Sequence, residues 1–215
     1  DGSADDRGSD ARPDRPDHLA TIGFTARSAT ATDIRLAAAI LLRRSDRRRY
    51  PGPPVAAGDL RAVSRCAARY GAAARHVPDQ LLPELAAPMR RAAARHAADQ
   101  DYLAELAEWS GCHGAPTGVP ARNTPAARSS DDVPVHVFAG NELPEFTESP
   151  DSAHWMVVCT TRDDRLAQLR AGEATSAMLL QATSRGLATS LQSEPLGIVD
   201  LRDQIRDTVL RRCAY

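Results

Sequence analysis

The residues best suited to binding chemistry form one arginine-rich run, Arg43–Tyr50 (RRSDRRRY). Its five guanidinium groups repel one another unless an anion lies among them. Arg43 and Arg47 are four residues apart, so a helical backbone would place both on one face. Two guanidinium groups and the hydroxyl of Ser45 suit the oxygens of a phosphate dianion. The other interpretation is a solvated basic helix end, where arginine complements the helix dipole.

A second informative stretch is 171–190 (AGEATSAMLLQATSRGLATS). Small residues at 171, 172, 174, 176 and 177 would let a helix pack tightly against a partner helix. Taken alone, this pattern favours an ordinary buried helix.

The sequence predicts no metal site and no catalytic side chain. Cys112-His113 is the one close histidine–cysteine pair, and adjacent residues point in different directions, which makes a poor chelate. The four cysteines contain no CxxC pair, so we expect reduced thiols and a cytoplasmic protein. No GxGxxG or P-loop motif follows a predicted strand.

The hydrophobic pattern predicts an α+β fold, because helical segments outnumber and separate the strands. Residues 1–17 are predicted to form a disordered lead, and 18–215 a single domain. Thr32 is the predicted N-cap of the first helix. The third helix is predicted to be broken by Pro83 and Pro88. Two further helices are predicted to end at Gly71 and Gly186. Helices are predicted over 33–44, 58–70, 79–88, 89–109, 163–185 and 200–212. Strands are predicted over 18–27, 73–77, 133–138 and 155–160, with a short extended piece over 187–191 and a lid-like loop over 111–132.

Bulk composition excludes several classes of protein. The net charge of −1 favours neither nucleic acid nor an anionic membrane as a partner. No apolar run reaches the roughly 18 residues that span a bilayer. All 27 basic residues are arginine and alanine is abundant, which indicates a GC-rich genome such as that of an actinobacterium.

Three ordered elements resemble the nitroreductase family. Arg43, Ser45 and Arg47 match its Arg-x-Ser-x-Arg/Lys motif, and the long helix of small residues ends in Gly-Leu-Ala at Gly186. The likeness is greatest to the degenerate actinobacterial branch, the Acg-type proteins linked to dormancy. That branch also has a Pro-Val after the arginine motif and a central GVPA element, as at Gly118–Ala121.

The resemblance implies a nitroreductase-like fold, with helices packed on a small mixed sheet, and an FMN cofactor. Arg43, Ser45 and Arg47 would hold the FMN phosphate and ribityl chain, and Gln192, Ser193 and Glu194 would lie near the isoalloxazine ring. The protein would pass hydride from NADH or NADPH through flavin to nitro compounds or quinones. Two alternatives stay open: a catalytically inactive protein that stores FMN beneath the 111–132 lid, and a helical interaction domain without a ligand.

The sequence departs from the family at both ends. We find no early Asn-x-Gln-Pro-Trp-like element, and the chain stops at Tyr215, where relatives continue. The sequence therefore predicts an incomplete nitroreductase-like fold. Its flavin site would need either a homodimer or a second half of the same chain.

Overall fold

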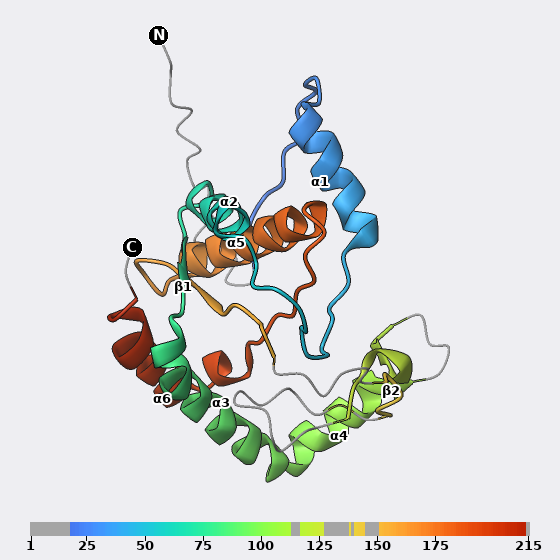
Figure 1. The fold of residues 1–215 in the computed structure, drawn as a ribbon, viewed down its shortest axis with the longest axis vertical. Coiled ribbons are helices and arrows are strands. Elements are labelled where there is room, and N and C mark those ends of the chain that lie inside the picture. The colour runs from blue at the N-terminus through green and yellow to red at the C-terminus, as the bar shows by residue number, and fades with distance from the viewer. Residues whose placement is uncertain (1–17, 113–116, 127–137, 139, 145–150, 214–215) are drawn as a thin grey trace.

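The computed structural model describes residues 18–112, 117–126, 138, 140–144 and 151–213 (Figure 1). The predicted lead over 1–17, most of the predicted strand over 133–138, and parts of the loop over 111–132 lie outside these residues. The helices are α1 (Ala31–Leu42), α2 (Ala57–Ala68), α3 (Leu82–Ala97), α4 (Gln100–Trp109), α5 (Arg165–Ser184) and α6 (Val199–Ile205). The strands are β1 (Ala73–His76), β2 (Ser110–Cys112), β3 (Val119–Pro120) and β4 (Met156–Cys159).

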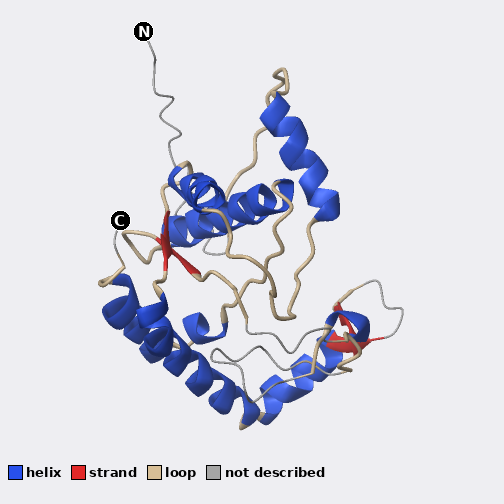
Figure 2. Ribbon diagram, in the orientation of Figure 1, coloured by secondary structure: helices blue, strands red, loops and turns tan. Residues whose placement is uncertain are grey.

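Helices dominate the described fold, and strands form two small sheets (Figure 2). β1 and β4 pair antiparallel, with Ala73 opposite Cys159 and His76 opposite Met156. β2 and β3 pair in parallel. The prediction of an α+β fold is confirmed. In place of one mixed sheet, however, the described residues form one antiparallel pair and one parallel pair.

The core has two parts. In one, Val63 and Ala67 of α2 pack with Ala174, Met178 and Ala182 of α5. In the other, residues of α3 pack with the last helix and with Val77, which follows β1. Ala67 and Ala174 are fully buried, and α2 and α5 lie side by side in Figure 1. Because alanine is short, it lets the two helices approach closely, so α2 is the partner of the small-residue helix.

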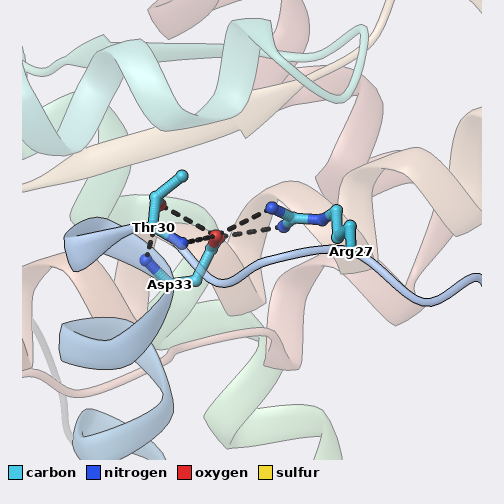
Figure 3. A network of polar contacts seen from close by, with 3 residues as sticks. All are labelled: Arg27, Thr30 and Asp33. Carbon is cyan, nitrogen blue, oxygen red and sulfur yellow. Dashed lines mark hydrogen bonds and ion pairs between the residues drawn. The ribbon is translucent and has the colours of Figure 1, made fainter.

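The start of α1 is fixed by a capping box at Thr30 instead of the predicted Thr32 (Figure 3). The Asp33 N–H donates to the Thr30 hydroxyl oxygen at 3.2 Å, and the Thr30 N–H donates to the Asp33 carboxylate at 2.8 Å. Arg27 adds a bidentate pair to the same carboxylate at 2.9 and 3.0 Å. These contacts, with that of Arg27 the strongest, hold the pKa of Asp33 well below its usual range. The Thr30–Asp33 spacing satisfies the free N–H groups of the first turn, which explains the earlier start.

The predicted strand over 18–27 is wrong. These residues form neither helix nor strand, and Phe24 is 95% exposed. Alternating apolar residues such as Ile22 and Phe24 would suit a strand, but the described sheets pair β1 with β4 and β2 with β3, and this segment joins neither of them. Apolar exposure continues along α1, where Ile34, Ile40, Leu41 and Leu42 face solvent and Ala39 is the one buried residue.

The predicted break near Pro88 is also wrong. The 3-10 turn η1 (Asp79–Leu81) leads into α3, which runs from Leu82 through Pro88 to Ala97. Pro83 lies in the first turn, where no N–H is needed, and the ring of Pro88 is fully buried, which offsets its missing hydrogen bond. The chain then breaks at Asp99, whose carboxylate caps α4. One long helix over 89–109 is therefore replaced by two.

The remaining elements follow the predictions with small shifts. β1 and β4 fall within the predicted strands, and β4 is partly buried. α5 begins after Asp164 and ends before Gly186, whose φ of +74° suits glycine. The last helix, α6, continues as the π-helical turn η4 (Arg206–Leu210).

Candidate functional site

The arginine motif leaves α1 in an extended form. Arg43 is the C-cap of α1 with φ −59° and ψ 127°, so the helix ends before the motif begins. Ser45 forms a parallel bridge with Thr189, and the Asp46 N–H donates to the Thr189 carbonyl at 3.0 Å. The backbone after Arg43 is therefore not helical, so the condition under which Arg43 and Arg47 would share a helical face is not met. Only Ser45 forms a bridge in this run, and the chain bends at Arg48, where the Arg48 N–H donates to the Asp46 carboxylate at 3.1 Å.

Two neighbouring arginines of the run are engaged by the protein itself. The Arg44 guanidinium donates to the carbonyls of Leu41 and Arg43 at 3.0 and 2.7 Å, where it complements the C-terminus of α1. Arg48 forms a bidentate pair with Asp46, with contacts of 2.9 and 2.7 Å. Its hydrogen bonds hold the pKa of Asp46 below its usual range.

The guanidinium groups of Arg43 and Arg47 differ from those of Arg44 and Arg48 in their contacts. Within the described parts of the chain, neither Arg43 nor Arg47 has a carboxylate partner. The Arg47 guanidinium carbon lies 4.6 Å from the centre of the Phe138 ring. Partial burial lowers the pKa of Arg47, because desolvation disfavours its charged form. A partly buried cation of this kind is suited to an anionic ligand.

Tyr50 anchors the end of the motif, a role that was not predicted from the sequence. Its hydroxyl donates to the Asp46 carbonyl, and its N–H donates to the Asp151 carboxylate at 3.0 Å. The Ser152 N–H donates to the Tyr50 carbonyl at 3.0 Å. Burial, followed by the nearby Asp46 and Asp151, raises the pKa of Tyr50. An aromatic side chain directly after the arginines, in a chain with 4% aromatics, is the signal that would have identified it.

The turn at Gln192–Glu194 begins three residues after Thr189. The Gln192 side-chain amide donates to the Ser190 hydroxyl at 3.3 Å, and Ser193 is exposed ahead of the 3-10 turn η3 (Glu194–Gly197). Glu194 instead turns toward α3 and α4, where its carboxylate contacts His96 and Tyr102. Ser45 is thus bound to the segment that leads into the turn. The Glu194 side chain, in contrast, is bound to α3 and α4.

Neither a metal cluster nor a membrane span is present in the described part of the chain. Within those ranges, no group of three or more histidine, cysteine, aspartate or glutamate side chains could hold a metal ion. No helix in the same ranges is long and apolar enough to cross a membrane.

Known proteins resemble the chain over most of its length. It is 42% identical over 208 residues to "Putative NAD(P)H nitroreductase Rv3131" of Mycobacterium tuberculosis, a match that covers 94% of this chain and 60% of the relative. It is 36% identical over 188 residues to "Putative NAD(P)H nitroreductase acg" of the same organism, over 82% of this chain and 55% of the relative. "Uncharacterized protein Rv3127" is 29% identical over 208 residues.

The matches cover only part of each relative. The chain spans 60% of the length of the first relative and 55% of the second. No protein-family model matches the chain. The two nitroreductase names and the identities behind them support a nitroreductase-like α+β fold. The chain therefore belongs to the nitroreductase family, in its Acg-like branch.

Proposed function

We propose that this chain binds FMN and uses it to pass hydride from NADH or NADPH to nitro compounds or quinones. The observation that carries the proposal is the pairing of Ser45 with Thr189 beside two arginines that have no carboxylate partner in the described residues. This bridge joins the arginine motif to the segment that leads into the turn at Gln192. It brings together two segments that are far apart in the sequence, which supports the proposal that both belong to one binding site.

The proposed phosphate contacts come from Arg43, Ser45 and Arg47. Arg47 is partly desolvated, so a dianion beside it would gain a strong, charge-assisted contact. Arg44 and Arg48 are excluded from this role because their guanidinium groups already bind the protein. In this assignment the chain supplies the cradle and FMN supplies the two-electron chemistry.

The proposed ring contacts come from the turn at Gln192, Ser193 and Glu194. Since the Glu194 carboxylate contacts His96 and Tyr102, the turn offers the ring its backbone and the side chains of Gln192 and Ser193. We assign no acid–base side chain, because hydride transfer between nicotinamide and flavin requires none. The loop over 111–132 is the proposed lid of this site.

The protein should purify yellow, or turn yellow when loaded with FMN, and NADPH should bleach it under anaerobic conditions. The visible absorbance of the bound flavin measures both steps. A yellow protein that NADPH and NADH leave unbleached would support the flavin-storage alternative in place of the oxidoreductase. A colourless protein that does not retain added FMN would contradict flavin binding altogether.

A second copy of the chain is the proposed partner for the apolar surface formed by the segment 19–24 and α1. Leu41 is 77% exposed there, and apolar patches of this kind mark interaction sites. The matched stretch spans 60% of the relative, so further chain of the same protein is the alternative cover for this surface. Closed two-fold dimers are the commonest homo-oligomers.

Sedimentation should therefore show a dimer at micromolar concentration, and Phe24→Asp with Leu41→Asp should convert it to a monomer. A charge buried against an apolar partner surface without a counter-ion strongly opposes association. Val199→Asp is the matched control, because Val199 is exposed on α6. A monomeric wild-type protein would remove the dimer proposal.

A further inference from the structure

Glu194 is bound by two side chains from a distant part of the sequence. Its carboxylate lies 3.1 Å from Nδ1 of His96 and 3.5 Å from the hydroxyl of Tyr102. The His96 and Tyr102 rings stack, with centroids 4.0 Å apart and planes at 13°. The side chain of Glu194 is 17% exposed, so this contact is partly shielded from water and weakened less by screening than a surface pair.

The three residues are held by separate elements. His96 lies in the last turn of α3, and Tyr102 lies in the first turn of α4. The Asp99 carboxylate caps α4 by accepting from the Tyr102 N–H at 3.0 Å, which fixes Tyr102 beside the end of α3. Pro195, next to Glu194, is buried, and η3 packs against α3 and α6. Glu194 is therefore fixed through both its side chain and its backbone.

The turn is consequently anchored at both ends. Thr189 is bound by the Asp46 N–H, and Glu194 is bound by His96 and Tyr102. Only residues 190–193 lie between these two points, a span too short to move far while both ends are held. Gln192 adds a hydrogen bond to Ser190 within this span. Burial, and next the charge of Glu194, raise the pKa of Tyr102 to about 12, so its hydroxyl remains a donor at neutral pH.

We propose that His96 and Tyr102 are positioning residues of the flavin site, which hold Glu194 and thereby fix the turn Gln192–Glu194 against the ring. This inference rests on the proposed FMN binding. In this assignment the two residues act on the flavin through Glu194 and the turn.

The test uses the full chain loaded with FMN and the variants His96→Ala, His96→Asn and Tyr102→Phe. His96→Ala should raise the dissociation constant of FMN up to about 10-fold, because a turn that is no longer held at Glu194 must be ordered when the ring binds. It should also shift the long-wavelength band of the bound flavin, because the groups beside the ring move. His96→Asn retains a side-chain N–H near the position of Nδ1 and should restore the band. Tyr102→Phe keeps the ring stack and should give a smaller shift.

The controls are His18→Ala and Tyr70→Phe, which replace residues outside this cluster. An unchanged flavin band in both His96→Ala and Tyr102→Phe would overturn the inference while leaving FMN binding intact. Wild-type protein that binds no FMN would overturn both proposals. If His96→Ala does not fold, the other two variants decide the test. The inference is supported if the flavin band of His96→Asn matches that of the wild type and the band of Tyr102→Phe is shifted. It is overturned if the wild type, His96→Asn and Tyr102→Phe all show the same flavin band.

Discussion

Replacing Arg43 and Arg47 together with alanine is expected to lower the affinity for FMN at least ~100-fold. Each charge-assisted contact contributes about 1.5–3 kcal/mol, and about 1.4 kcal/mol corresponds to a tenfold change in affinity. Two lost contacts therefore predict a decrease of ~100-fold to ~10⁴-fold. The fold should tolerate the change, because the backbone N–H of Arg43, not its side chain, binds the Ala39 carbonyl. Titration of the purified proteins with FMN, followed by fluorescence quenching, measures the effect.

The matched control is Arg61→Ala with Arg65→Ala on α2. These arginines are also four apart and exposed, so the control removes the same charge from a different surface. It should leave the affinity for FMN within about threefold of the wild type, because long-range charge effects are screened by salt. Equal losses in the two double variants would show that net charge, and not a phosphate cradle, governs binding.

Leu201→Ala is expected to lower the free energy of unfolding by about 2–5 kcal/mol, the usual cost of a large-to-small change in a core. Leu201 is 0% exposed on α6, which packs against α3 and η3. Removing three carbon atoms there loses transfer free energy and leaves a cavity that the helices fill only in part. Since a domain of this size is stabilised by roughly 5–15 kcal/mol, the loss should be visible in a urea titration followed by circular dichroism.

Val199→Ala on the same helix provides the comparison. Val199 is 62% exposed, so its truncation should change the free energy of unfolding by less than about 0.5 kcal/mol. Similar urea midpoints for Leu201→Ala and the wild type would mean that α6 is not part of a cooperative core.

Local signals predict most of the helices, because the residues that end a helix act on neighbouring backbone. Gly186 has the positive φ that its position requires, and Asp164 caps α5 because its carboxylate accepts a hydrogen bond from the Ala167 N–H at 2.8 Å. The predictions fail where distant packing decides the result. Pro88 remains inside α3, where its ring is buried, and the alternating residues near Phe24 pair with no strand in the described fold. The pairing of β1 with β4 joins segments about 80 residues apart, which no local pattern indicates.

The candidate site also has a part that local sequence patterns predict and a part that depends on packing between distant segments. The types and spacing of Arg43, Ser45 and Arg47 are sufficient to identify a candidate motif, although its backbone is not helical. No sequence pattern indicates that Thr189 lies beside Ser45, or that Glu194 binds His96. Both contacts depend on how α1, α3 and α5 pack, and the sequence alone does not specify those distances.

Arg43 is both the first residue of the motif and the residue that ends α1, so a single peptide unit separates the apolar helix from the proposed phosphate cradle. If copies of the chain associate through that helix, cofactor retention and self-association become thermodynamically linked. Each would strengthen the other by the same factor, as the reciprocity of coupled equilibria requires. Dilution would then favour release of the cofactor, and loss of the cofactor would favour separation of the copies.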